Sequence, residues 1–242
     1  PALAHEAEAV NAVKHLQYIT AIFGNPPYNN RSENKTPWIM NLIAIYKQKV
    51  RQEETQIQAL SDDYVKFLRL ADWSVSRAGL GAIGMITNNG YLDGHIFRDL
   101  REHLVQSCSI VRVLNLHGDS RKKERTPDGT ADKNVFDIMQ GVSILILARH
   151  VERHGAASVS YADLWGDRDM KYRMLSVGNP TEGCVAISPQ AATKMLIPVQ
   201  QSATPDWETA HPLAECFGTG NWQEDKTYAY GSGFKSQQDE FA

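Results

Sequence analysis

Residues 81–118, GAIGMITNNGYLDGHIFRDLREHLVQSCSIVRVLNLHG, contain the pattern that decides the fold. The segment opens with a short apolar strand pattern and passes through a polar loop into an amphipathic helix pattern at residues 95–107. It ends in a second strand pattern at residues 110–118. Strands that are apolar throughout and alternate with helices are typical of a sheet covered on both faces. The segment therefore predicts an α/β fold with helices on both faces of a sheet.

One strand pattern and two helix patterns precede this segment. Residues 16–24 (LQYITAIFG) predict a buried strand. Thr36 followed by Pro37 is typical of a helix start, and the apolar spacing that follows extends this helix into the 50s. A second helix is predicted to begin at Ser61 and to end at Gly79.

The chain continues with a long polar loop and a further strand pattern at residues 141–150. No helix pattern separates this strand from the one before it, so we expect an antiparallel pair at that edge of the sheet. Beyond Trp165 the pattern weakens and prolines recur at short intervals. We therefore expect residues 1–165 to form one α/β unit and residues 166–242 to form an irregular C-terminal extension.

Composition excludes several classes of protein. Hydrophobic residues make up 42% of the chain and charged residues 22%, which is ordinary for a globular protein. The formal net charge of −3 gives no general attraction to nucleic acid, so any DNA contact needs a local basic patch. No apolar run is long enough to span a membrane, and no signal peptide opens the sequence, so we expect a cytoplasmic protein.

Neither the cysteines nor the histidines predict a metal centre. Cys108, Cys184 and Cys216 lie far apart and form no CxxC pair, so we expect neither a disulfide framework nor a zinc site. The HVERH stretch at residues 150–154 lacks the order of a zinc-protease helix.

The stretch AIFGNPPYNN, residues 21–30, places an unusual corner after the first strand. Two consecutive prolines fix two φ angles and remove two backbone donors, so the corner is rigid and rich in acceptors. Ligands of open α/β sheets bind at the carboxyl ends of strands, where this corner is predicted. Asn25 offers a side-chain carbonyl, Pro26 a backbone carbonyl stiffened by Pro27, and Tyr28 a flat ring.

This combination suits chemistry on the exocyclic amine of adenine. That nitrogen is a poor nucleophile because its lone pair is delocalised into the ring. Acceptors for both of its N–H groups stabilise the positive charge that develops during attack. An aromatic ring can stack on the base once it is swung out of the duplex.

The corner resembles the catalytic motif of amino-group DNA methyltransferases, which transfer a methyl group from S-adenosylmethionine to adenine N6. GLGAIGMITNNGYLDG and FRDLREHLVQSCSIVRVLNLHG followed by NVFDIMQGVSILILAR are similar to later parts of the adenine-specific branch. The stretch ENKTPWIMNLIAIYKQ is similar to large fused restriction-modification proteins of the type ISP kind. The resemblance covers roughly residues 18–149.

This resemblance implies a fold, a mechanism and partners. The fold is the catalytic half of a Rossmann-like methyltransferase sheet. Asn25, Pro26, Pro27 and Tyr28 are the implied catalytic residues, acting by direct transfer without a covalent enzyme intermediate. Phe136 is implied as a second ring on the flipped base. The implied partners are double-stranded DNA and fused nuclease, helicase-like and target-recognition domains, the last beginning near the stretch GSGFKSQQDEFA.

The cofactor turn of the family has no counterpart in the sequence. Only about twenty residues precede the corner, and the stretch PALAHEAEAVNAVKHLQ contains no glycine. Gly79-x-Gly81-x-x-Gly84 follows a helix and precedes a strand, the reverse of the order that a nucleoside-binding turn needs. We expect the S-adenosylmethionine site upstream of Pro1, in a longer protein of which this chain is a fragment, and we expect the isolated fragment to be inactive.

One basic run could contact DNA. The stretch SRKKER contains Lys122, Lys123 and Arg125, which could neutralise phosphates beside the cleft, although a solvated loop with acidic neighbours is an equally good interpretation.

Other functions remain open at this point. The same corner would serve methylation of a protein glutamine amide or of cytosine N4, and a non-enzymatic DNA-binding scaffold is a further alternative. We predict an adenine-N6 DNA methyltransferase region of a restriction-modification protein.

Overall fold

The computed structural model describes residues 4–6, 8, 11, 18–28, 32–150, 155–178, 183–189 and 194–198. The chain divides into two units, residues 1–198 and residues 199–242. The second unit lies outside the described residues, as do His154, Cys216 and most of the predicted C-terminal extension. The boundary predicted at residue 165 therefore stays a prediction.

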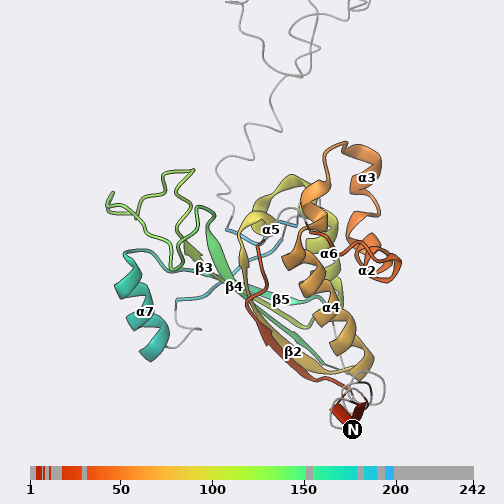
Figure 1. The fold of residues 1–242 in the computed structure, drawn as a ribbon. Coiled ribbons are helices and arrows are strands. Elements are labelled where there is room, and N and C mark those ends of the chain that lie inside the picture. The colour runs from red at the N-terminus through yellow and green to blue at the C-terminus, as the bar shows by residue number, and fades with distance from the viewer. Residues whose placement is uncertain are drawn as a thin grey trace, which may run out of the picture. The chain divides into compact units, whose positions relative to one another are not determined.

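A six-stranded mixed sheet forms the centre of the first unit (Figure 1). The strands lie in the order β1-β2-β4-β3-β5-β6. β1 pairs in parallel with β2, and β3 pairs in parallel with β5, whereas the pairs β2–β4, β3–β4 and β5–β6 are antiparallel. The strands are β1 (Ala21–Gly24), β2 (Gly81–Asn88), β3 (Ile110–His117), β4 (Val142–Arg149), β5 (Ser158–Asp163) and β6 (Val185–Ala186).

Helices flank this sheet, which confirms the predicted α/β class. In Figure 1, α4 and α6 lie on one side of the sheet and α7 lies on the other. The helices are α2 (Pro37–Ile43), α3 (Val50–Glu53), α4 (Asp63–Ala78), α5 (Gly90–Asp93), α6 (Arg98–Ser107) and α7 (Arg168–Val177), with short 3-10 helices η1 (Ala44–Lys47), η2 (Gln58–Ser61) and η3 (His95–Phe97).

The predicted start of the first helix and end of the second agree with the structure, whereas the second helix begins at Asp63 with Asp62 as its N-cap, and not at Ser61. Thr36 is the N-cap of α2, and Pro37 is its first residue. The helix that was predicted to run into the 50s is divided into α2, η1 and α3. Gly79 ends α4 with a φ of 76°, a left-handed conformation that glycine adopts without steric cost.

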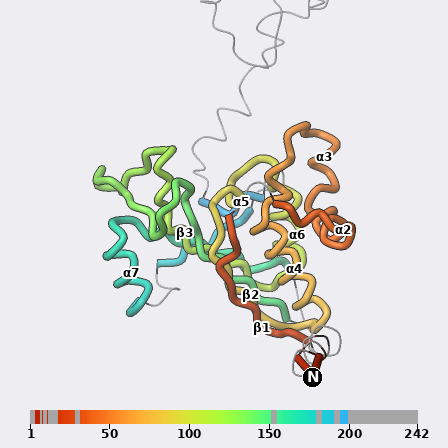
Figure 2. Tube along the Cα trace, in the orientation of Figure 1, coloured from red at the N-terminus to blue at the C-terminus, as the bar shows by residue number. Residues whose placement is uncertain are grey.

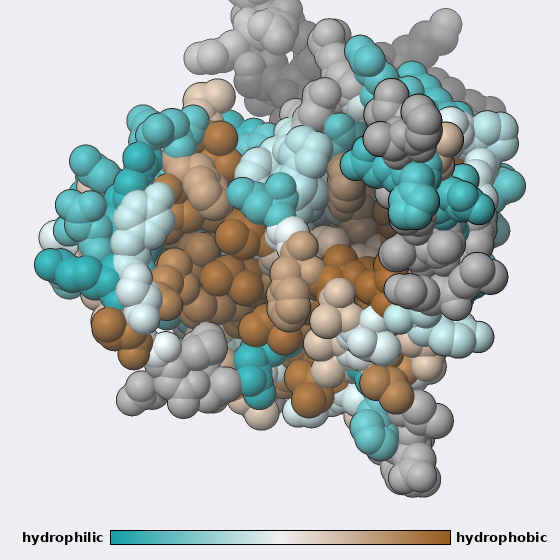
Figure 3. All heavy atoms as spheres, turned by 60° about the horizontal axis from the view of Figure 1, so that its bottom comes forward, coloured by the Kyte–Doolittle hydropathy of each residue, from teal (hydrophilic) through white to brown (hydrophobic). Residues whose placement is uncertain are grey.

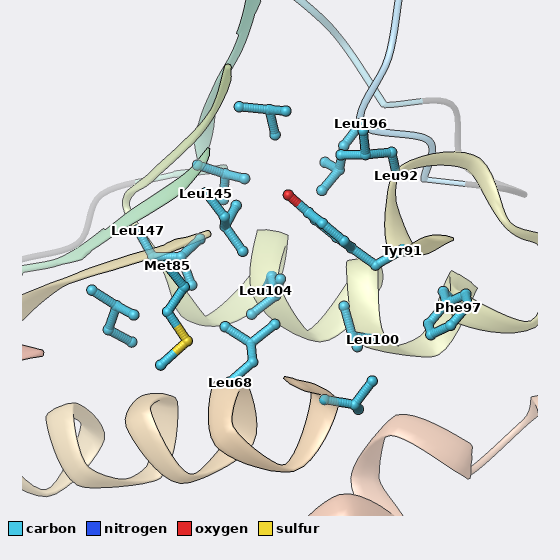
Figure 4. Close-up of a cluster of buried hydrophobic side chains, with 14 of the residues drawn as sticks. Leu68, Met85, Tyr91, Leu92, Phe97, Leu100, Leu104, Leu145, Leu147 and Leu196 are labelled. Carbon is cyan, nitrogen blue, oxygen red and sulfur yellow. The ribbon is translucent and has the colours of Figure 1, made fainter. Parts of the chain in front are cut away.

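The hydrophobic core lies between the sheet and the helices α4 and α6 (Figure 4). Alternate side chains of β2, β3 and β4 point into it, as expected for a pleated strand. Leu68 of α4 and Leu104 of α6 are fully buried there, together with Tyr91 of α5. Burial of these apolar side chains is the main stabilising contribution to the fold.

The opposite face of the sheet is covered less completely. A small cluster of Leu116, Val135 and Val142 lies under the loop 118–141. Elsewhere on this face the side chains of β2 and β4 are half-buried, and Phe23 of β1 is 77% exposed. Figure 3 shows apolar side chains gathered in a hollow of the molecular surface. Exposed apolar surface of this extent commonly marks a contact surface.

Two predictions about the sheet were wrong in detail. The first strand is mostly exposed rather than buried, because β1 contributes only four residues and, within the described residues, pairs with β2 alone (Figure 2). The antiparallel pair β3–β4 does form, but it lies inside the sheet and not at an edge. β5 and β6 extend the sheet beyond β3, and the sequence analysis predicted neither strand. Among the described helices, none is sufficiently long and apolar to cross a membrane.

Candidate functional site

The corner Asn25–Tyr28 lies at the carboxyl end of β1. The parallel pairing of β1 with β2 ends at Gly24, opposite Met85, because the two following prolines have no N–H to donate. Pro26 is buried, whereas Asn25 and Pro27 are exposed. The rigid part of the corner is therefore packed, and the asparagine side chain faces solvent.

Tyr28 and Asn25 are joined by a hydrogen bond across the corner. The Tyr28 hydroxyl donates to Asn25 Oδ1 at 2.7 Å and lies 3.4 Å from the carbonyl oxygen of Ile86 on β2. Burial raises the pKa of Tyr28 to about 12, so the hydroxyl keeps its proton at neutral pH and acts as a donor. The bond orients the Asn25 carbonyl and leaves its second lone pair for another donor.

Phe136 packs on the same apolar cluster as Tyr28 although it is far away in sequence. Phe136 and Tyr28 both pack against the small cluster formed by Leu116, Val135 and Val142. Asn134 holds the backbone at Phe136, since its Oδ1 accepts a hydrogen bond from the Phe136 backbone N–H at 2.9 Å. The structure thus brings the two predicted aromatic residues onto one cluster at the carboxyl end of the sheet.

The predicted basic residues do not join that cluster. Lys122, Lys123 and Arg125 are exposed on the loop 118–141, which also carries Phe136. The Arg125 guanidinium donates to the Gly129 carbonyl oxygen within the same loop. One loop therefore carries an exposed basic segment and, farther along the chain, the aromatic residue that shares a cluster with Tyr28.

A polar network that the sequence analysis missed follows the carboxyl ends of β2, β3 and β5. Asn89 donates to Asn115 Oδ1 at 2.7 Å, and Asn115 Nδ2 donates to the Tyr161 hydroxyl at 2.9 Å. The Tyr161 hydroxyl donates to Asp163 Oδ1 at 2.5 Å, and the same oxygen lies 2.7 Å from His117 Nε2. A histidine directly after an apolar strand was the available signal, but its partner Asp163 lies on the unpredicted strand β5.

His117 occupies the centre of this network. Its ring stacks on Trp165 with 3.3 Å between ring centroids, and its Nδ1 lies 3.6 Å from Glu124 Oε1, the distance of an ion pair. Burial alone would lower the pKa of His117, but the carboxylates of Asp163 and Glu124 outweigh it and raise the pKa. Burial alone would raise the pKa values of both carboxyl groups, yet their contacts with His117 lower them.

The glycines of residues 79–84 have structural roles and do not form a cofactor turn. Gly79 ends α4 and Gly81 begins β2, as the sequence order predicted. A side-chain carbon at Gly84 would lie 2.7 Å from the Phe23 ring, so this glycine makes room for β1. Within the described part of the chain, no group of three or more histidine, cysteine or acidic residues is placed to hold a metal ion.

Comparison with known proteins identifies relatives of this arrangement. Residues 4–121 match the profile of the Eco57I restriction-modification methylase family. The ATP-dependent type ISP restriction-modification enzyme LlaBIII bound to DNA superposes with a TM-score of 0.67 and 28% identity, over 79% of this chain. A comparison with curated proteins finds no match.

Two further solved structures share the fold at lower identity. A nuclease-deletion mutant of the type ISP enzyme LlaGI with a DNA substrate mimic gives a TM-score of 0.69 at 23% identity over 82% of the chain. The DrdV–DNA complex gives 0.68 at 20% identity over 85% of the chain. The chain spans only 13% of the LlaBIII chain and 20% of each of the other two. The resemblance inferred from the corner is confirmed: residues 4–121 match the Eco57I restriction-modification methylase family, and the chain is similar to type ISP restriction-modification enzymes.

Proposed function

We propose that this chain carries the target-amine site of a DNA methyltransferase that acts on adenine N6 within a restriction-modification system. The observation that supports it most directly is the hydrogen bond between Tyr28 and Asn25 Oδ1, which fixes an exposed amide carbonyl at the carboxyl end of a strand. The family match over residues 4–121 and the likeness to LlaBIII support methylation in such a system.

In this proposal the corner holds the amine by its two N–H groups. Asn25 Oδ1 accepts one hydrogen bond with its second lone pair, and the Pro26 carbonyl accepts the other. Both acceptors stabilise the positive charge that the nitrogen develops when its lone pair forms the new bond to carbon. Tyr28 and Phe136 supply aromatic surface for a base that has left the duplex.

The reaction needs a methyl donor, and we propose S-adenosylmethionine, which supplies an electrophilic methyl group. The glycines of the Gly79–Gly84 stretch serve the end of α4 and the packing of β1, so we do not assign the cofactor to them. The function proposed for these residues is therefore to bind and activate the amine, and no step is assigned through the cofactor.

Double-stranded DNA is the proposed partner. LlaBIII is described as bound to DNA. We propose that Lys122, Lys123 and Arg125, which are exposed, contact the DNA phosphates. Fused nuclease, helicase-like and target-recognition domains are proposed by likeness to type ISP enzymes.

The test is Asn25→Ala in the intact protein that contains these residues, assayed with labelled S-adenosylmethionine and DNA. Turnover is expected to fall by several powers of ten with DNA affinity nearly unchanged, because only the amine loses an acceptor. Asn41→Ala is the matched control, since Asn41 is an exposed asparagine on α2. An equal loss of DNA affinity in Asn25→Ala would contradict the proposal.

The methylated product identifies the substrate. After digestion of the DNA, the label is expected in N6-methyladenine. Label in N4-methylcytosine would identify cytosine as the substrate, and label in a protein glutamine would identify a protein substrate. Methylation that survives Asn25→Ala would support the non-enzymatic alternative for this chain.

A further inference from the structure

The loop 118–141 is tied to the rest of the molecule by buried polar contacts. Asn134 Nδ2 donates to the carbonyl oxygens of Gly118 and Gln140, at the two ends of the loop. Lys171 of α7 forms an ion pair with Asp132 and donates to the carbonyl oxygen of Lys133 at 2.6 Å. These contacts hold the second half of the loop, whereas the basic segment 121–125 lies in the first half.

The Glu124 side chain helps to hold the first half of the loop, alongside backbone contacts such as the bridge between Arg125 and Ala131. Glu124 Oε2 accepts a hydrogen bond from the backbone N–H of Asp119 at 2.8 Å. Asp119 Oδ1 in turn accepts from the backbone N–H groups of Arg121 and Lys122 at 3.0 and 3.2 Å. The backbone of the basic segment is therefore held through Asp119 and Glu124.

Glu124 reaches the sheet through His117. Its Oε1 faces His117 Nδ1, and His117 Nε2 faces Asp163 on the neighbouring strand β5. The imidazole is only 5% exposed. At 3.6 Å the Nδ1 of His117 makes no hydrogen bond to Glu124, so this contact is an ion pair that exists only when the imidazole is protonated.

We propose that His117 is a positioning residue that, in its protonated form, holds Glu124 and thereby the basic segment 121–125 against the sheet for contact with DNA phosphates. The DNA part of this inference rests on the proposed function. The positioning part rests on the contacts of His117, Glu124 and Asp119 alone. His117 is not assigned a contact with the reacting base.

The pH at which this contact is lost follows from the charges around the ring. Asp163 faces it from β5 and also accepts a hydrogen bond from Tyr161, and Glu124 faces it from the loop. Lys122 adds a positive charge near Glu124, and Lys171 binds the carbonyl oxygen of Leu116, the residue before His117. The net effect raises the pKa of His117, so the contact is present below the ordinary value of 6.5 and is lost as the pH rises through the higher folded value.

Limited trypsin digestion tests the positioning without using DNA. Trypsin cleaves after the lysine and arginine residues of the segment 121–125, provided that the segment can leave its folded position. Cleavage within this segment, normalised to an unfolded reference peptide at each pH, is expected to accelerate severalfold between about pH 6 and about pH 9. A rate that does not change with pH would overturn the proposal.

Two variants and a matched control assign this change to His117. His117→Asn removes the cation and suits the backbone, since φ is 53° and asparagine tolerates positive φ. Glu124→Gln keeps an acceptor for Asp119 but removes the carboxylate charge. Both variants are expected to be cleaved rapidly at every pH. His103→Asn, in which the lost histidine binds Asp72 at 2.9 Å on the helix-covered side, should keep the wild-type profile.

Persistence of the wild-type profile in both His117→Asn and Glu124→Gln would overturn the proposal. Affinity for double-stranded DNA, measured over the same pH range, distinguishes a failure of the positioning proposal from a failure of the proposed DNA function. Affinity of the wild type is expected to fall where cleavage accelerates, and affinity of the two variants should be low throughout. If cleavage follows the expected profile but no DNA binds at any pH, the positioning role stands and the DNA function fails.

Discussion

The sheet is held from its two sides by different kinds of contact. On the side of α4 and α6, fully buried leucine, valine and tyrosine side chains fill the space between helices and strands. On the side of α7, the loop 118–141 is held mainly by buried polar groups, among them Lys171, Asp132, Asn134 and His117. Only a small apolar cluster accompanies them.

The two kinds of contact have different roles: apolar contacts stabilise the fold, and buried polar contacts position the loop. Apolar burial is proportional to area and not directional, so many side chains of similar volume satisfy it. A buried ion pair or hydrogen bond is satisfied only at one geometry, and an unpaired member is costly. The α7 side therefore fixes where the loop and its functional residues lie, and it does so through groups that titrate.

The largest expected effect comes from Asp132→Ala. The side chains of Lys171 and Asp132 are both 0% exposed, with 2.8 Å between nitrogen and oxygen. Removal of the carboxylate leaves a buried ammonium group, which is expected to lower the free energy of unfolding by about 3–5 kcal/mol. Urea denaturation measures this loss. The control is Asp137→Ala, because Asp137 is 92% exposed in its pair with Arg168 and should cost less than about 1 kcal/mol.

A similar loss is expected on the helix side from Leu104→Ala. Leu104 is fully buried between α6 and the sheet, so the truncation removes buried area and leaves a cavity. The free energy of unfolding is expected to fall by about 2–5 kcal/mol. Unlike the effects on the α7 side, this loss should be the same at acid and alkaline pH. A loss that varied with pH would weaken the contrast between the two sides.

A smaller effect is expected from pH acting on His117. Its raised folded pKa means that the stabilisation is fully present below the ordinary value of 6.5 and is lost as pH rises through the folded value. Asp163 and Glu124 have lowered pKa values, so their contribution is lost as pH falls through those values. The stability difference between wild type and His117→Asn should therefore be largest at intermediate pH. Denaturation across a pH series measures it, and a flat difference would contradict the ion-pair assignment.

The smallest effect is expected from Phe23→Ser on β1. Phe23 is 77% exposed and rests on Gly84, so little buried area is lost. The free energy of unfolding should change by no more than about 0.5 kcal/mol in thermal or urea denaturation. A loss as large as that of Leu104→Ala would show that the open face is as tightly packed as the helix-covered face.

Local patterns accounted for much of the fold but little of the α7 side. The boundaries of α2 and α4 follow from Pro37 and Gly79, whose conformational preferences act within a few residues. β5 escaped prediction because its six residues, SVSYAD, carry few apolar side chains. Without β5 no partner for His117 could be named, and the network at the carboxyl ends of the strands stayed hidden.

The candidate site likewise has one part that local sequence predicts and another that only the tertiary structure shows. Asn25, Pro26 and Tyr28 are neighbours in the chain, so their chemistry could be inferred from the sequence alone. The position of Phe136 on the same cluster as Tyr28 depends on contacts between residues more than a hundred positions apart, which no local pattern encodes.

The sequence by itself determined the α/β class, the proline corner and its acceptor-rich chemistry, because these depend on local conformational preferences and on the residues present. Only the tertiary structure decided that β1 is an exposed strand, that the pair β3–β4 lies inside the sheet, and that His117 joins Asp163 and Glu124. The reason is physical: strand order, burial and the pairing of buried charges depend on which distant segments meet, and this is settled by packing of the whole chain.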